Sequence, residues 1–298
     1  MNATIENEVV ERIVPKILTK EQIEFFIEEG YLVVENLINN DELQELKDDI
    51  IDFARGKYPS KSIEGISEGM SPDEVLKEIL CIHQSHFLSP VSKKYVEHPK
   101  ICGALSQIVA GHLPHWDGSV KCCQSMLFVK SPGLPGQSWH QDEIYIPTRD
   151  RSLTGAWIAI DDATVENGTL WVIPKSHKKG YLYPQKENTN NEDFDYTQES
   201  YGFDSSEEIP VEVPAGSVVF FNGYLLHRSA KNRSQNYRRV LVNHYLNAYS
   251  LLPWNKEEGQ SVANSDIRRI VPVAGIDPYA WKGVIGDGKD VSLRSYQK

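Results

Sequence analysis

The 298-residue sequence has few cysteines and no long apolar run, and both features exclude classes of protein. Its four cysteines form no CxxC pair and lack the spacing of a zinc site. No stretch approaches the roughly 18 consecutive apolar residues of a membrane-spanning helix. The acidic N-terminus lacks the basic segment and apolar run that form an export signal. We therefore expect reduced cysteines, no membrane span and a cytoplasmic location.

Positive charge is also scarce in this chain. It has 31 lysines and arginines against 42 acidic residues, which gives a net charge of −11 at pH 7. Phosphate backbones select a basic surface, so we expect no general binding to nucleic acid or to an anionic membrane. The 40% hydrophobic and 24% charged residues are ordinary for a folded globular chain. At this length a chain needs no disulfide or structural metal to hold a core.

The first part of the chain, residues 1–118, has the signals of a mainly helical support region. A capping box and a terminal glycine bound one helix within residues 19–30. Asn40, with two acidic residues after it, is expected to cap a second helix, and Ser71 before a proline a third. A fourth helix is expected near residues 99–110.

From residue 119 to 250 the sequence changes to short segments rich in β-branched and aromatic residues, separated by turn formers. They are VKCCQSMLFVK, LTGAWIAIDDA, GTLWVIP, SVVFFNGYLLH and RRVLVNHYLNAY. Several strands divided by turns suggest a sandwich or barrel. Residues 183–210 are polar, acidic and too long for an ordinary connection, so they form either a lid or a solvated loop. Residues 251–298 form an extension without an interpretable motif, and we expect one domain over residues 1–298.

A candidate metal site lies in the strand-rich part. His140 and Asp142 are two residues apart, so in a strand their side chains point to the same face. His227 ends the segment SVVFFNGYLLH and supplies a second imidazole. Two histidines and one carboxylate on a β scaffold form the facial triad of non-haem Fe(II) oxygenases, with positions left for a chelating co-substrate and O₂. Arg238 on the next strand is placed to pair with a co-substrate carboxylate, whereas Arg239 faces the opposite side.

In five segments the chain resembles the phytanoyl-CoA dioxygenase family of Fe(II)- and 2-oxoglutarate-dependent oxygenases. They are QSMLFVKSPG, SWHQDEIYI, LTGAWIAIDDATVENGTLWVIPKSH, PAGSVVFFNGYLLHRSAKNRSQNYRR and VNHYL. The resemblance covers about residues 18–250. It implies a mainly β fold with flanking helices, built on a double-stranded β-helix of the cupin-like jelly-roll type. It also implies an enzyme that uses Fe(II), 2-oxoglutarate and O₂, releases succinate and CO₂, and oxidises a small-molecule substrate.

The resemblance assigns roles to individual residues. The matches are the iron ligands His140, Asp142 and His227, and the 2-oxoglutarate contacts Arg238, Ser229, Trp157 and Met126. Core packing is the alternative role for Trp157 and Met126. Gln124 and Lys130 would share a strand face with Met126, and Gln124 is expected to enter the pocket in preference to Lys130. Some members of the family add a lysine from the segment before a helix near residue 91, but here EILCIHQSHFLSP contains none.

The expected reaction is hydroxylation, with desaturation or ring closure as related outcomes. Related halogenases carry alanine or glycine in place of Asp142, so the carboxylate argues against halogenation. Two other functions stay open: a metal-binding jelly roll that works as a sensor or binding module without turnover, and a cupin-type isomerase or hydrolase. The net charge of −11 does not favour a polyanionic CoA thioester, and the residues define neither the substrate nor the oligomeric state.

Overall fold

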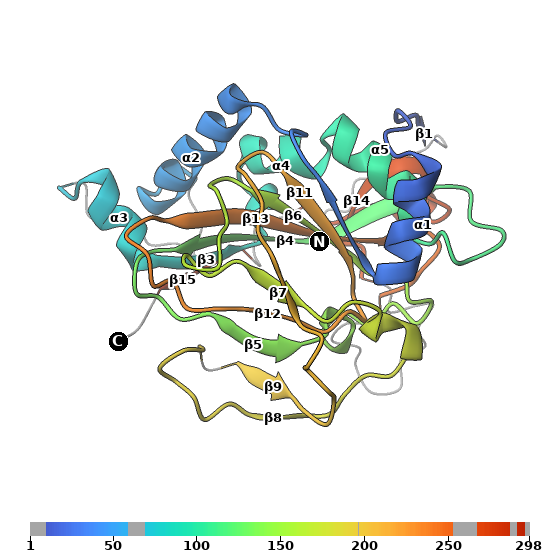
Figure 1. Cartoon of the computed structure of the whole chain (residues 1–298). Coiled ribbons are helices and arrows are strands. Elements are labelled where there is room, and N and C mark those ends of the chain that lie inside the picture. Colours follow the sequence, from blue (N-terminus) through green and yellow to red (C-terminus); the bar gives the residue numbers. More distant parts are fainter. Residues whose placement is uncertain (1–9, 59–68, 196, 253–266, 287–290, 296–298) are drawn as a thin grey trace, which may run out of the picture.

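The computed structural model has a mainly β architecture in which two antiparallel sheets face each other (Figure 1). It describes residues 10–58, 69–195, 197–252, 267–286 and 291–295. Helices cover the outer face of the larger sheet, and the smaller sheet lies on its other side. The predicted fold class, a jelly roll with flanking helices, is therefore confirmed. A single domain over the whole chain remains a prediction.

Among the described residues, the major sheet has nine strands, with the path β1-β14-β4-β13-β6-β11-β2 and with β3 and β15 joined through β4. Its strands are β1 (Glu11–Arg12), β2 (Tyr31–Val34), β3 (Ile79–His83), β4 (Val120–Lys130), β6 (Thr154–Ala159), β11 (Val218–Asn222), β13 (Arg238–Asn247), β14 (Val271–Ile276) and β15 (Ser292–Ser295). The minor sheet has the order β10-β7-β12-β5. Its strands are β5 (Gln137–His140), β7 (Leu170–Val172), β10 (Ile209–Val211) and β12 (His227–Ser229).

Helices occupy much of the N-terminal region, as the sequence predicted. They are α1 (Lys20–Glu29), α2 (Asn40–Ala54), α3 (Pro72–Glu78), α4 (Pro90–Val96) and α5 (Pro99–Ile108). The predicted caps of the first and third helices are confirmed, but Asn40 does not cap the second. Asn39 does so instead: its side chain accepts from the Glu42 amide at 3.0 Å, and Glu42 accepts from the Asn39 amide. A capping box requires Glu or Gln three residues after the cap; Glu42 stands there for Asn39, whereas Leu43 stands there for Asn40.

The N-terminal region is not purely helical, because β1, β2 and β3 belong to the major sheet. β2 pairs with β11 at one end of the sheet, and β3 pairs with β4 near the other. The outer face of the sheet and the helices bury one continuous core, which includes Phe53, Tyr95 and Tyr245. These contacts hold the sheet that carries one wall of the site.

Strand β13 shows how the two faces are separated. Leu241 and Tyr245 pack against the helices, whereas Val240 and Val242 point into the space between the sheets. Side chains alternate along a strand, so Arg238 and His244 share the inner face with these valines. The sequence predicted this direction for Arg238, and the strand brings both residues into the interior of the jelly roll.

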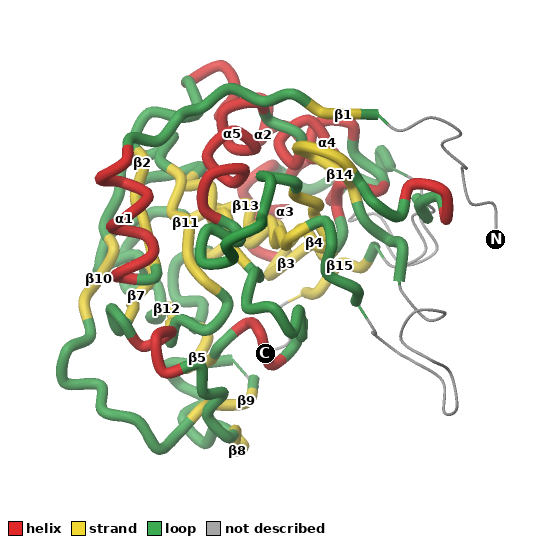
Figure 2. Tube along the Cα trace, turned by 90° about the vertical axis from the view of Figure 1, so that its right-hand side faces the viewer, coloured by secondary structure: helices red, strands yellow, loops and turns green. Residues whose placement is uncertain are grey.

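The polar segment 183–210 lies along the minor sheet. It forms the hairpin of β8 (Gln185–Glu187) and β9 (Gln198–Ser200), seen at the lower edge of Figure 2, before it enters β10. Gly136 exchanges two backbone hydrogen bonds with this segment, to Asp193 O and from the Asp195 amide, each at 2.8 Å. The segment is thus fastened beside β5, and its role as a lid that closes on substrate stays a prediction.

Part of the C-terminal extension joins the fold, because β14 and β15 pair with β4 and β3. Its residues 253–266, 287–290 and 296–298 lie outside the described residues. All four cysteines are free thiols and buried. In the part of the chain that the structure describes, no helix has the length and apolar composition to cross a membrane.

Candidate active site

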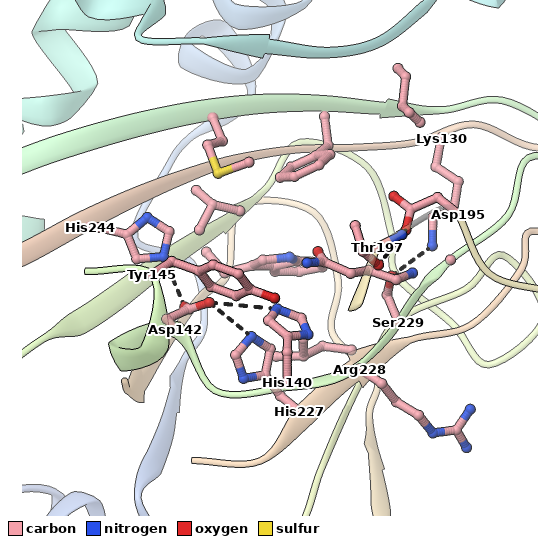
Figure 3. Close-up of a pocket in the computed structure, with 18 of the residues that line it drawn as sticks. Lys130, His140, Asp142, Tyr145, Asp195, Thr197, His227, Arg228, Ser229 and His244 are labelled. Atoms are coloured by element: carbon pink, nitrogen blue, oxygen red, sulfur yellow. Dashed lines mark hydrogen bonds and ion pairs between the residues drawn. The ribbon is translucent and has the colours of Figure 1, made fainter. Parts of the chain in front are cut away.

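A cavity of about 500 Å³ lies between the two sheets. Its walls come from β3, β4, β6 and β13 of the major sheet, from β5, β7 and β12 of the minor sheet, and from the segment 183–210. Figure 3 shows two ends of this space, one with His140, His227 and Asp142, the other with Lys130 and Ser229. The polar residues at each end determine what the cavity can bind.

The predicted triad is brought together at one end of the cavity. His140 is the last residue of β5 and His227 the first of β12, and the two are direct partners in the ladder. Their ring centroids lie 4.1 Å apart. Asp142 Oδ1 lies 3.5 Å from His140 Nε2 and 3.6 Å from His227 Nε2. One ligand atom from each residue lies within 4.8 Å of the others, and all three residues are buried, so the group can hold a metal ion.

The local structure at Asp142 differs from the sequence prediction. β5 ends at His140, and Asp142 opens a short 3₁₀ helix, η2 (Asp142–Ile144), so the two residues do not share a strand face. The Tyr145 and Ile146 amides donate to the Asp142 carbonyl and hold this turn. Asp142 therefore reaches the cavity through the turn, not through strand alternation.

The position of His227 also needs a correction. β11 ends at Asn222, and His227 does not end that strand but begins β12 in the other sheet. A turn separates the two strands, in which Asn222 Oδ1 accepts from the Tyr224 amide at 2.9 Å. This crossing from the major to the minor sheet places His227 opposite His140.

Hydrogen bonds orient both imidazoles of the triad. His140 Nδ1–H donates to Ser138 O at 2.7 Å, and His227 Nδ1–H donates to Leu225 O at 2.9 Å. With the donated proton on Nδ1, Nε2 of each ring is the nitrogen that can present a lone pair to a metal at the centre of the triad. Burial, and then the neighbouring His227, lower the pKa of His140 to about 4, so this ring is neutral at physiological pH.

The carboxyl group of Asp142 is ionised. Burial alone would raise its pKa, but His227, His244 and His140 together hold the pKa below its ordinary value. Two imidazoles and one carboxylate, on one side of a cavity, are the donor set that fits Fe(II) with open coordination positions. The assignment of these three residues as iron ligands remains a prediction, which the geometry supports.

The other end of the cavity holds two buried basic side chains. Arg238 is 4% exposed and Lys130 is 5% exposed. Burial lowers the pKa of Arg238 to about 10, and burial followed by the charge of Arg238 lowers the pKa of Lys130 well below its usual range. In the described part of the chain neither forms an ion pair, and Arg238 Nε has no hydrogen-bond partner. Such a pair fits an anionic ligand, because uncompensated buried charges are costly.

Ser229 lies beside these cations, as the resemblance implies. Its Oγ accepts from Lys130 Nζ and from the Gln137 amide, each at 3.1 Å. Both bonds use Oγ as the acceptor, so the hydroxyl proton is available to a ligand oxygen. Lys130 also donates to Ala230 O at 2.6 Å, which fixes the ammonium at this end.

The remaining predicted contacts also line the cavity: Trp157 from β6, and Met126 and Gln124 from β4. The Arg238 guanidinium carbon lies 5.7 Å from the centre of the Trp157 ring, a cation–π distance. Gln124 lines the cavity, and Lys130 lines it as well. The even spacing of Gln124, Met126 and Lys130 along one strand was the signal for both.

Several residues at the mouth were not assigned to the cavity by the sequence. Asp195 and Thr197 come from the segment 183–210, and Arg294 comes from β15. Arg294 and Asp195 form an ion pair at 2.7 Å, and Thr197 Oγ1 donates to Asp195. No local motif marks these residues, because chain segments far apart in the sequence bring them together.

Comparisons with known proteins show the family of this chain. The sequence profile of the phytanoyl-CoA dioxygenase family (PhyH) matches residues 26–240. Phytanoyl-CoA dioxygenase 1 from Oryza sativa subsp. japonica is 31% identical over 270 residues, which cover 80% of this chain and 92% of that protein. Phytanoyl-CoA dioxygenase from Arabidopsis thaliana is 30% identical over 258 residues, covering 76% and 88%. The chain belongs to the phytanoyl-CoA dioxygenase family, as its sequence indicated.

Solved structures share the fold at lower sequence identity. The carbocyclase SnoK from nogalamycin biosynthesis, described as non-heme and alpha ketoglutarate dependent, has a TM-score of 0.59 and 22% identity over 82% of this chain and 92% of its own. EctD from S. alaskensis with bound Fe has a TM-score of 0.60 and 19% identity, covering 82% and 85%. The cofactor prediction of Fe(II) and 2-oxoglutarate is confirmed by the family membership together with the donor set of the buried triad. The chain is thus an Fe(II)- and 2-oxoglutarate-dependent oxygenase by family and site.

Proposed function

We propose that this enzyme hydroxylates a small organic molecule in the cavity between its sheets, with release of succinate and CO₂. The observation that carries the proposal is the pairing, in one cavity, of a metal-binding triad at one end with two buried basic side chains, Arg238 and Lys130, at the other. A chelating dianion such as 2-oxoglutarate can bind the metal with one end and the cations with the other. Asp142 favours hydroxylation over halogenation, because the carboxylate occupies the position that a halide would need.

Each polar group has a defined part in this proposal. His140, His227 and Asp142 would hold Fe(II), which when bound supplies the activation of O₂. Arg238 would pair with the far carboxylate of 2-oxoglutarate through its planar fork, and Lys130 would add a second positive charge. The Ser229 hydroxyl would donate to the same carboxylate. The neutralised charges then stay buried, which favours binding of the co-substrate in a space that excludes water.

The substrate would occupy the remaining part of the cavity, next to the triad and below the segment 183–210. This part is lined mainly by apolar side chains, among them Leu80, Phe128 and Ile146. The cation at its mouth, Arg294, is already paired with Asp195. An apolar or weakly polar substrate suits this lining better than a polyanion does.

A direct test uses the protein with Fe(II) and labelled 2-oxoglutarate in air, with succinate as the readout. The wild-type protein should form succinate, and a panel of small apolar alcohols and amines should contain compounds that accelerate it. His227→Ala leaves two protein ligands and should reduce succinate formation by at least 100-fold. The loss is large because the three ligands act together, so that removal of one disables the site. Equal succinate from the wild type and His227→Ala would refute the proposal and favour a binding module without turnover.

A further inference from the structure

We propose that His244 is a positioning residue that keeps Asp142 bound to the metal through one oxygen only. The inference rests on the proposed function of the triad and concerns a residue outside it. His244 lies on the inner face of β13, and its side chain is buried and faces the triad (Figure 3). His244 Nε2 lies 2.9 Å from Asp142 Oδ2, within hydrogen-bond distance.

The two oxygens of Asp142 have different neighbours. Oδ1 faces the imidazoles of His140 and His227 at 3.5 and 3.6 Å, where a shared metal ion would sit. Oδ2 faces His244. An ionised carboxylate can only accept a hydrogen bond, so His244 is the donor. Oδ1 is therefore available to a metal, whereas Oδ2 is already hydrogen-bonded to His244.

Each residue of the triad has one orienting hydrogen bond, and only that of Asp142 is distant in sequence. His140 and His227 each donate to the carbonyl two residues earlier in the chain. Asp142 lies in the 3₁₀ turn, where strand geometry does not fix its direction. Its carboxylate is instead held by a side chain 102 residues away. Without His244, rotation of the carboxyl group about χ2 is restrained only by packing and by the metal.

The other nitrogen of His244 indicates which form of the ring donates. Nδ1 is buried and has no hydrogen-bond partner among the described residues. A second proton there would be a buried donor without an acceptor, which is costly. The geometry therefore assigns the donated proton to Nε2, the nitrogen that faces Asp142 Oδ2.

Whether Asp142 would bind the metal through one oxygen or two determines how many coordination positions remain for other ligands. Three protein atoms on an octahedral ion leave three positions, two for the chelating co-substrate and one for O₂. A carboxylate that bound through both oxygens would take one of the three. By holding Oδ2, His244 keeps that position free, and it keeps Oδ1 aimed at the metal.

The test compares two substitutions at position 244 with Co(II) alone as the probe. His244→Leu removes the donor, whereas His244→Gln keeps an N–H at a similar reach. We expect His244→Leu to weaken Co(II) binding by about 10- to 100-fold, the usual cost of losing a group that orients a metal ligand. Its visible Co(II) spectrum should also change, because the coordination of Asp142 changes. His244→Gln should restore most of the affinity and the wild-type spectrum.

Controls separate this proposal from the proposed function. Asn243→Ala changes the neighbouring residue on β13, which is buried and precedes His244, and Co(II) affinity should stay within twofold of the wild type. If wild type and His227→Ala bind Co(II) alike, the triad assignment itself fails. If wild type binds at the triad and His244→Leu has the same affinity and spectrum, only the role of His244 is overturned. Equal losses in the leucine and glutamine variants would also overturn it, because they would indicate packing instead of a hydrogen bond.

Discussion

Two adjacent arginines at the start of β13 have different surroundings. Among the described residues Arg238 forms no ion pair and faces the cavity, whereas Arg239 forms a two-pronged ion pair with Asp161, with both N–O distances at 2.7 Å. Strand alternation explains the difference, since consecutive side chains point to opposite faces. The sequence predicted the opposite directions of Arg238 and Arg239, because the register of a strand with one buried face is strongly determined.

Replacing these arginines one at a time tests which of them binds 2-oxoglutarate. Arg238→Ala should raise the apparent KM for 2-oxoglutarate by at least roughly 25-fold, since it removes a buried charge pair that contributes about 2–5 kcal/mol. Arg238→Lys should restore only part of the affinity, because an ammonium lacks the planar fork. The measurement is a 2-oxoglutarate titration under saturating Fe(II).

Arg239→Ala is the matched control for this experiment. It removes an ion pair on the other face of the strand and should leave the KM nearly unchanged, although the protein loses some stability. A large effect at 239 with a small one at 238 would contradict the assignment and would require a one-residue shift of the strand register.

His86 gives the protein a predictable response to acid. The side chain is 3% exposed, its Nδ1 lies 2.7 Å from Ser125 Oγ, and burial lowers its pKa to about 4. The unfolded chain binds a proton at about pH 6.5, whereas the folded chain does so only near pH 4. The free energy of unfolding therefore falls as the pH drops through this window, by roughly 2 kcal/mol between pH 7 and pH 5.

Urea unfolding of the metal-free protein at these two pH values checks this prediction. His86→Gln keeps a hydrogen-bonding group near Ser125 but does not titrate, so its free energy of unfolding should change less with pH than that of the wild type. The same pH dependence in both proteins would show that other groups cause the acid sensitivity.

At the scale of elements, the strands were predicted better than the connections between them. VKCCQSMLFVK corresponds to β4 and RRVLVNHYLNAY contains β13, because both have clear β composition and buried faces. The turn at Asp142 and the sheet crossing before His227 were not predicted, because each depends on which strands pair. The triad was predicted partly from strand alternation, which does not hold at Asp142, and partly from residue types and their order, which do not depend on the local backbone.

For the segment 183–210 and the C-terminal strand β15, too, the sequence did not predict which parts of the chain pair. The composition of residues 183–210 indicated a functional or solvated loop, yet it did not reveal the hairpin or the contact with β5. Arg294 reaches the cavity because β15 pairs with β3 at the edge of the sheet. A pairing between strands some 200 residues apart leaves no local signal in one sequence.

A glycine in β6 lets the major sheet support the triad. Gly155 is paired with Phe221 of β11, and a Cβ at position 155 would lie 2.3 Å from the Phe221 ring. That ring packs against His227, with centroids 4.8 Å apart. Gly155→Ala should therefore displace Phe221, destabilise the protein by about 1–3 kcal/mol and weaken Co(II) binding at the triad.

Thermal unfolding and a Co(II) titration test this prediction together. Gly111→Ala is a suitable control, because a Cβ there meets no heavy atom closer than 3.5 Å. Unchanged Co(II) affinity in a folded Gly155→Ala protein would show that Phe221 does not position His227.

At the scale of the whole molecule, the cavity is lined by parts of the chain that are far apart in the sequence. Asp195 and Thr197 belong to the segment 183–210, Arg294 to the C-terminal extension, and Tyr145 to the turn after Asp142. Gln185 of the segment donates to the Tyr145 hydroxyl at 2.7 Å. The segment therefore contacts the mouth directly, which is where a lid would act.

Limited trypsin digestion tests whether this segment closes over the site. Lys186 in β8 is an exposed cleavage point. Anaerobic addition of Fe(II) and 2-oxoglutarate should slow cleavage there relative to cleavage elsewhere in the chain, because a filled cavity gives Asp195 and Thr197 further contacts. If the ratio of the two cleavage rates does not change, and substrate does not change it either, the segment is not a lid.

The central claim is that one cavity binds a metal through the triad and 2-oxoglutarate through the cationic end at the same time. The most direct measurement is an anaerobic titration of the metal-free protein with Fe(II) and 2-oxoglutarate, followed by the charge-transfer absorption of a chelated complex. We predict one such complex per chain, lost in His227→Ala and shifted to much higher 2-oxoglutarate concentration in Arg238→Ala. A wild-type protein without this absorption, or a His227→Ala protein that retains it in full, would contradict the account.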